Sequence, residues 1–223
     1  MTVERKFFGQ PKFSGEGVTA PVGYELFVRE FNDGRWVLPD DFNSITADEL
    51  EHLLLDAIHR LPDEVSILSF NLEQHQFVDP AYRQMVRRIQ DATPIVIFTE
   101  LTERVNPDVT QDALLAAAKA FHDDGLRVCI DDVGTEGNDQ AFVEELEGYV
   151  DEYKFAMQNL RPFKHVTDIV GVLAPWYTYT QKHRKMMAIE GIETDEDLAY
   201  LKEHFPCDVL QGYYLGKPTD LKE

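Results

Sequence analysis

Two adjacent carboxylates, Asp131 and Asp132, follow an apolar stretch at residues 126–130 that is typical of a short buried strand. Neighbouring carboxylates repel each other, and their burial is costly in free energy. A hard cation such as Mg²⁺ offsets both costs, because carboxylate oxygens are the ligands that it prefers. An isolated Asp-Asp pair also fits a solvated acidic turn. The pair therefore indicates a metal site only if further oxygen ligands lie nearby.

Further polar residues occur in or just after other predicted strands. They are Glu25, Asn71, Glu100, Lys154, Glu190 and Gln211. In a (β/α)-barrel the carboxyl ends of the strands form the active-site face, so residues far apart in the sequence converge there. Each residue alone fits a capped turn, a surface carboxylate or a satisfied core amide. The whole set, drawn with the two aspartates from seven strands, predicts a site of hard oxygen ligands.

The elements that would position these residues alternate between strands and helices. Strands are expected at residues 6–13, 22–30, 65–72, 95–101, 126–130, 149–156, 185–192 and 207–210. Helices are expected at residues 46–61, 80–89, 110–124, 138–148 and 162–174, and from Thr194 onward. This alternation predicts parallel pairing, since parallel strands need a crossover connection. The expected fold class is α/β, a TIM-like (β/α)8 barrel formed by residues 1–223 as a single domain.

Composition excludes some functions and allows others. The formal net charge of −20 argues against binding of a nucleic-acid polymer or an anionic membrane. A small anionic ligand stays compatible if metal ions reverse the local field. The two cysteines, Cys129 and Cys207, lie in apolar segments and are expected to be buried thiols. Residues 1–6 are not followed by an apolar signal region, and no apolar run reaches membrane-spanning length, so we expect a soluble cytoplasmic protein.

Short motifs along nearly the whole chain resemble those of the EAL-domain family of cyclic di-GMP phosphodiesterases. In the first half, Gln10-Pro11 resembles Q-P, residues 25–29 resemble E-A-L-x-R, Asn71 begins a counterpart of N-x-S, and residues 100–103 match E-x-T-E. In the second half, residues 131–135 resemble D-D-F-G-T, Lys154 falls at the Lys of K-I-D, residues 190–194 match E-G-V-E-T, and residues 211–213 with 217–218 match Q-G-Y and K-P. One such tripeptide would carry little weight, but seven motifs in the right order after the opening Gln10-Pro11 are a specific signal.

The resemblance implies a two-metal phosphodiesterase that uses one or two Mg²⁺ or Mn²⁺ ions and converts cyclic di-GMP into linear pGpG. Two ions close together lower the pKa of a shared water and stabilise the attacking and leaving oxygens of the phosphoryl group. The residues implied to hold the first ion are Glu25, Asn71, Glu100 and Asp131. Asp131 would bridge to a second ion, bound also by Asp132 and Glu190.

The same resemblance implies roles for the remaining residues. Lys154 would position the attacking water, and Glu190 would assist its deprotonation. Gln211 would support the site from the last strand, and Arg29 would contact a substrate phosphate.

The sequence departs from the family pattern at four places. Leu26-Phe27 replaces Ala-Leu, Glu73 replaces a Ser, and Ala156 replaces the Asp of K-I-D. The loop at residues 134–139 carries charged side chains where the family has small ones, namely Glu136 and Asp139. In the family this loop couples metal binding to dimerisation, so the change bears on regulation and turnover more than on metal binding.

These departures leave two alternatives to an active hydrolase. The first is a catalytically inactive EAL-like module that acts as a cyclic di-GMP receptor or as a regulator through protein interaction. The second is a metal-dependent barrel hydrolase with another phosphodiester substrate. A homodimer or a regulatory protein partner is compatible with all three.

Overall fold

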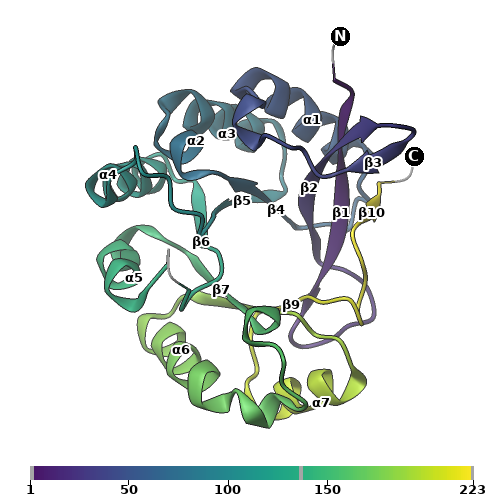
Figure 1. Cartoon of the computed structure of the whole chain (residues 1–223), viewed down its shortest axis with the longest axis vertical. Helices are drawn as coiled ribbons and strands as arrows, with labels where there is room; N and C mark the ends of the chain where they lie inside the picture. Colours follow the sequence, from purple (N-terminus) through teal and green to yellow (C-terminus); the bar gives the residue numbers. More distant parts are fainter. Residues whose placement is uncertain (1–2, 136–137, 222–223) are drawn as a thin grey trace.

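The computed structural model describes residues 3–135 and 138–221, and a closed ring of eight strands forms the centre of this part (Figure 1). In hydrogen-bonding order these strands are β1 (Arg5–Ser14), β2 (Gly23–Asn32), β4 (Ile67–Leu72), β5 (Val96–Leu101), β6 (Arg127–Ile130), β7 (Glu152–Ala156), β8 (Met186–Glu190) and β9 (Val209–Leu210). Strand β1 pairs with both β2 and β9, which closes the barrel. Two short strands, β3 (Arg35–Val37) and β10 (Thr219–Asp220), extend the sheet from β2 and β1. The prediction of an eight-stranded α/β barrel is confirmed.

The strands from β2 through β9 run parallel around the ring, but β1 is antiparallel to both of its neighbours. The prediction of wholly parallel pairing is therefore wrong for β1. The reason lies in the connection to β2, because residues 15–22 contain no helix and a short connection joins antiparallel strands. The register of this pair sets Gln10 opposite Glu25, so β1 also contributes side chains near the predicted site.

Helices stand around the outside of the barrel, as Figure 1 shows from α1 to α7. Their bounds are α1 (Ala47–Arg60), α2 (Gln74–Val78), α3 (Pro80–Ala92), α4 (Gln111–Asp123), α5 (Gln140–Leu146), α6 (Val170–His183) and α7 (Asp195–His204). Thr46, Thr110 and Thr194 each accept a hydrogen bond from the backbone N–H three residues later, as the sequence predicts for N-caps. Helix α5 begins later than predicted, because Asp139 and not Asn138 accepts the capping hydrogen bond.

Helix α6 continues through Pro175, so the prediction that this proline ends a helix is wrong. The predicted helix at residues 162–174 is instead a single turn at Val166–Asp168 followed by α6. Proline removes one backbone N–H and crowds the preceding turn of a helix. Leu173, Trp176 and Thr180 on the same helix are buried, and the burial of this face offsets the missing hydrogen bond.

Apolar side chains fill the layer between strands and helices, whereas polar side chains occupy the inside of the barrel. In the apolar layer, the rings of Phe77 and Phe121 stack with centroids 4.8 Å apart. Inside the barrel, Lys12 on β1 contacts Glu100 on β5, although these strands are not neighbours in the sheet. Polar groups away from water need partners, and the charged side chains inside the barrel pair with one another across the ring.

The structure also addresses the cysteines and the membrane question. Both thiols are free and Cys129 is buried, as predicted. Cys207 is half-buried, so the prediction of a buried thiol holds only in part at this position. Within the described ranges, every helix is too short or too polar to traverse a bilayer.

Candidate active site

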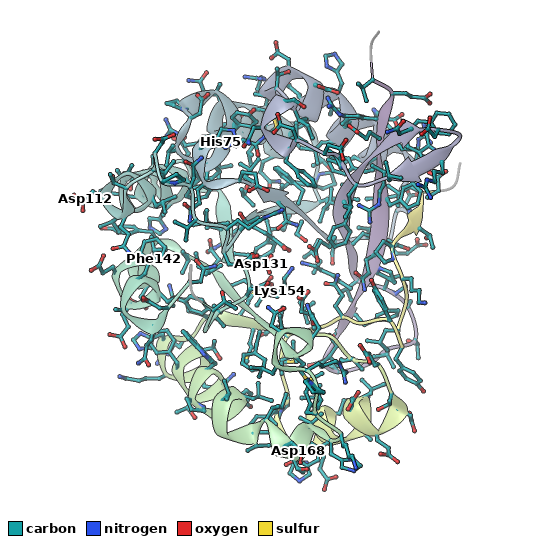
Figure 2. All side chains as sticks on the ribbon, in the orientation of Figure 1. His75, Asp112, Asp131, Phe142, Lys154 and Asp168 are labelled. Carbon is teal, nitrogen blue, oxygen red and sulfur yellow. The ribbon has the colours of Figure 1, made fainter. Side chains whose placement is uncertain are left out.

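Four carboxylates from four strands surround the ammonium of Lys154. Its Nζ lies 3.1 Å from Glu25 Oε2, 2.7 Å from Glu100 Oε2, 3.0 Å from Asp131 Oδ1 and 3.4 Å from Glu190 Oε2. Figure 2 shows the labelled Asp131 and Lys154 together at the centre of the ring, whereas Asp112 and Asp168 lie at its periphery. The convergence of these residues at one mouth of the barrel, predicted from their positions in or just after strands, is therefore present.

Two amide side chains hold Glu25 in place. Asn71 Nδ2 donates to Glu25 Oε1 at 3.0 Å, and Gln211 Nε2 donates to Glu25 Oε2 at 2.8 Å. Asn71 lies on β4, and Gln211 directly follows β9. The hydrogen bond from Gln211 therefore links the Q-G-Y motif near the end of the chain to Glu25 of the E-A-L-x-R motif near its beginning. The Oε1 atom of Gln211 is buried and has no hydrogen-bond partner among the described residues. An acceptor left free in this way is available to a cation or a donor from outside the chain.

Glu100 is held from two sides by lysines. Lys12 Nζ lies 2.7 Å from Oε1, and Lys154 Nζ lies 2.7 Å from Oε2. Burial alone would raise the pKa of the Glu100 carboxyl, but the two ammonium groups lower it well below its usual range. Glu100 is therefore ionised throughout the physiological range of pH. Sequence reasoning missed Lys12, although it lies two residues after Gln10 and so on the same face of its strand.

The other carboxylates are less well compensated. Burial, with repulsion from Glu100, raises the pKa of Glu25 to about 7. Burial raises the pKa of Asp131 well above its usual range, and burial with repulsion from Glu190 raises the pKa of Asp132. Burial would lower the pKa of Lys154, but the charges of Asp131, Glu100, Glu190 and Glu25 raise it well above its usual range. The site thus holds more negative charge than its lysines balance, which favours a bound cation.

Asp132 adopts an unusual backbone conformation at the turn after β6. Its φ of +49° lies in the left-handed region, which is uncommon for residues other than glycine. The turn is stabilised by Thr135 Oγ1, which donates to the Asp132 carbonyl at 2.7 Å, and by Asn138 Nδ2, which donates to the Asp131 carbonyl. The buried Oδ1 of Asp132 has no partner among the described residues. This turn therefore presents an unpaired carboxylate oxygen beside Asp131.

Glu190 is oriented by a side chain that the sequence analysis missed. Gln158, which follows β7, donates from Nε2 to Glu190 Oε1. Gly191 has a φ of +81°, and a side chain on it would collide with Gln158. The tight turn after β8 thus requires glycine here, which gives the Gly of the E-G-V-E-T motif a structural reason.

Two groups of side chains bring ligand atoms within 4.8 Å of one another in the described part of the chain. One is Glu103, Asp131 and Asp132, and the other is Glu100, Cys129 and Glu152. The first group offers only oxygen donors, includes the unpaired Oδ1 of Asp132, and fits a hard divalent cation such as Mg²⁺ or Mn²⁺. In it Glu103 takes the place expected for Glu190, whose Oε1 accepts a hydrogen bond from Gln158.

A cleft of about 520 Å³ opens over the carboxylates. Its walls include Phe27, Phe42 and Arg29, for which the family resemblance implies contact with a substrate phosphate. Glu73 and Arg104 form an ion pair of 2.8 Å in the same wall. The volume is in the range of sites for small organic ligands, so the cleft places a ligand-sized space directly above the charged cluster.

The departures from the family pattern have different structural consequences. Asp139 caps α5, so its charge serves the helix. Ala156 is buried and pairs in register with Glu190, without any polar group of its own to offer. Glu136 lies outside the described residues.

The fold and the site define a class, namely α/β barrels with an acidic, oxygen-rich site at the carboxyl ends of the strands. The chain belongs to the EAL domain family, whose model matches residues 10–218. This confirms the resemblance carried by the motifs.

Individual relatives agree with this assignment. PdeD of Escherichia coli K12, a probable cyclic di-GMP phosphodiesterase, is 26% identical over 239 residues, which cover 99% of this chain and 42% of PdeD. An EAL-domain protein of Listeria monocytogenes superposes with a TM-score of 0.78 at 21% identity, over 96% of this chain and 88% of that chain. Bacillus subtilis YkuI, solved with cyclic di-GMP and calcium, superposes with a TM-score of 0.76 at 18% identity, over 98% of this chain and 57% of that chain. The chain thus spans less than half the length of PdeD, and the structural likenesses establish the fold.

Proposed function

We propose that this protein hydrolyses cyclic di-GMP to linear pGpG with one or two Mg²⁺ or Mn²⁺ ions. The observation that carries the proposal is the gathering of Glu25, Glu100, Asp131 and Glu190 around Lys154 beneath a ligand-sized cleft. Uncompensated negative charge at this mouth would repel an anionic dinucleotide, whereas bound divalent cations would attract it.

The residues that would hold the ions fall into two groups. Glu25, Asn71, Glu100 and Asp131 would hold one ion, and Asp132 would hold a second with Asp131 and either Glu190 or Glu103. Such ions, when bound, lower the pKa of water and stabilise negative charge on the reacting phosphoryl group.

The chain's own groups would bind and orient the substrate and handle its protons. The Lys154 ammonium, already within 3.4 Å of four carboxylates, would hold the attacking water against them by hydrogen bonding. Glu190, whose Oε1 is fixed by Gln158, would accept the proton at Oε2. Arg29 in the cleft wall would bind a phosphate oxygen of the dinucleotide.

The relatives support the substrate by analogy. PdeD is named as a probable cyclic di-GMP phosphodiesterase, and YkuI was solved with cyclic di-GMP as its substrate and with calcium. Both names describe those proteins, so activity of the present chain rests on the site described above.

One observation favours a second candidate, a cyclic di-GMP receptor without turnover. Lys154 bridges all four carboxylates directly, which partly neutralises the mouth with no ion at all, and Ala156 supplies no carboxylate beside it. A module in this state would bind the dinucleotide through the cleft walls and leave it intact.

Calorimetric titration separates these candidates. Protein freed of metal is titrated with Mn²⁺ and then with cyclic di-GMP, and the nucleotide is analysed afterwards. We expect Mn²⁺ binding that Glu25→Ala weakens, followed by release of linear product. Dinucleotide binding without product favours the receptor, and binding of neither ligand contradicts both candidates.

A further inference from the structure

Lys12 contacts the proposed metal site from inside the barrel. Its side chain is 2% exposed, and its Nζ lies 2.7 Å from Glu100 Oε1, which is fully buried. Among the described residues, Glu100 provides the one carboxylate within ion-pair distance of Lys12. An ammonium and a carboxylate paired this closely away from water form a strong and well-directed interaction.

The two lysines bind different oxygens of the same carboxylate. Lys12 takes Oε1, whereas Lys154 takes Oε2 and also reaches Glu25, Asp131 and Glu190. A cation that binds among Glu25, Asp131 and Glu190 would compete with Lys154 for Oε2 of Glu100. The bond between Lys12 and Oε1 lies on the other oxygen and survives this exchange.

This arrangement has a consequence for the choice of metal. Calcium accepts six to eight oxygen ligands and often takes both oxygens of one carboxylate. Magnesium requires a nearly ideal octahedron, which suits carboxylates that each give one oxygen. A carboxylate with one oxygen already occupied by an ammonium group is restricted to ligation of the metal through its other oxygen.

Resting on the metal site of the proposed function, we propose that Lys12 is a positioning residue that limits Glu100 to one-oxygen ligation. In this role Lys12 favours small octahedral ions such as Mg²⁺ over Ca²⁺. Lys12 is not among the residues that line the cleft, so it acts through the orientation of Glu100.

The test measures the dissociation constants for Mg²⁺ and for Ca²⁺ by calorimetry, without nucleotide, in wild type and Lys12→Met. We expect the ratio of the Ca²⁺ constant to the Mg²⁺ constant to fall by about tenfold in Lys12→Met, a typical effect for a residue that orients a metal ligand. Lys12→Arg, which keeps a charged donor, should retain the wild-type ratio.

Glu152 provides the matched control. It is a buried carboxylate near Lys12, and burial raises its pKa while the Lys12 charge lowers it. Glu152→Gln leaves the contact between Lys12 and Glu100 intact and should keep the ratio. If Lys12→Met does not fold, Lys12→Met/Glu152→Gln removes the ammonium without changing the net charge inside the barrel.

The outcomes distinguish the role of Lys12 from the proposed metal site on which it depends. An unchanged ratio in a folded variant that lacks the Lys12 ammonium would overturn this inference and leave the proposed metal site standing. Failure of the wild type to bind either ion would overturn the proposed metal site and this inference with it.

Discussion

The ammonium of Lys154 on β7 lies 3.0 Å from Oδ1 of Asp131, which directly follows the adjacent strand β6. The same ammonium reaches Glu25 and Glu100 on strands further around the ring. Lys154 thus occupies the centre of the carboxylate cluster, where the proposed ions would bind. Its replacement separates the electrostatic role of this position from its chemical role.

We predict that Lys154→Met lowers turnover of cyclic di-GMP by about 10²–10⁴-fold, the usual loss when a group that handles a catalytic proton or water is removed. Mn²⁺ binding should be as tight as in wild type or tighter, because one positive charge leaves a cluster of four carboxylates. Turnover assays and calorimetry check the two parts. Loss of Mn²⁺ binding in a folded variant would assign Lys154 a purely structural role.

The pH dependence of stability follows from the buried carboxylates. The pKa of Glu25 is about 7 in the folded protein against an ordinary value of 4.5. A raised pKa contributes stability that is fully present below 4.5 and is lost as the pH rises through about 7. Asp131 and Asp132 act in the same direction, whereas the lowered pKa of Glu100 matters only in stronger acid. The melting temperature of metal-free protein should therefore fall as the pH rises from about 5 to 7.5.

Two comparisons control this pH measurement. Glu25→Gln has no proton to lose at this position, so its melting temperature should fall less steeply over the same range. Mn²⁺ at 100 times its dissociation constant should restore about 2.7 kcal/mol at neutral pH by mass action. Equal slopes for wild type and Glu25→Gln would contradict the assignment of the effect to Glu25.

The ion pair between Glu73 and Arg104 predicts opposite effects on substrate binding. The Arg104 guanidinium is half exposed in the cleft wall and lies 5.3 Å from the centre of the Phe42 ring. Arg104→Ser should raise KM about tenfold with kcat nearly unchanged. A cation in the cleft wall, away from the carboxylate cluster, would attract the anionic dinucleotide equally in the ground state and the transition state. Glu73→Ser should lower KM, because it releases Arg104 from its partner and removes an acidic group. Steady-state kinetics with KM changing in the same direction in both variants would contradict this role.

Asn138 links the turn of Asp131 to the helix that follows. Its side chain is fully buried and donates to the Asp131 backbone carbonyl. The backbone carbonyl of Asn138 accepts a hydrogen bond from the Gly134 N–H. Asn138→Ala should reduce the free energy of unfolding by about 1–3 kcal/mol, the cost of leaving a buried carbonyl unpaired. Urea denaturation measures this loss.

Asp139→Ala is the matched variant for Asn138→Ala. It removes the cap of α5 at a cost of about 1 kcal/mol but touches neither Asp131 nor Asp132. Mn²⁺ affinity should fall in Asn138→Ala and stay at the wild-type value in Asp139→Ala. Equal affinities in the two variants would mean that the turn does not depend on Asn138.

Much of the site could be predicted because most of its acidic and amide residues lie near the end of an apolar strand or just after it. Asn71, Glu100 and Asp131 do so in the sequence, and a barrel brings strand ends to one face. Glu25 lies inside its predicted strand, and its place in the site was implied by the E-A-L-x-R resemblance. Their convergence needed no knowledge of side-chain packing.

Other contacts of the site could not be predicted, because they depend on distances across the barrel. Lys12 is a single charged residue within a strand, and its partner Glu100 lies 88 positions later. Gln158 follows β7 without any motif, and its role depends on the turn at Gly191. Such contacts are set by tertiary structure, which local spacing does not encode.

The errors in the fold have local causes as well. No helix follows the first strand, and this permits antiparallel pairing of β1 with β2. The alternation of strands and helices in the rest of the chain gave no indication of this pairing. Proline lowers helix propensity strongly, yet burial of Leu173 and Trp176 outweighs this preference in α6.

The central claim is tested most directly by following cyclic di-GMP over time in the presence of wild-type protein and excess Mn²⁺, with Asp131→Asn in parallel. The account predicts that wild type converts the nucleotide to linear pGpG and that Asp131→Asn is slower by at least about 100-fold. Intact cyclic di-GMP after prolonged incubation with metal-loaded wild type would contradict it.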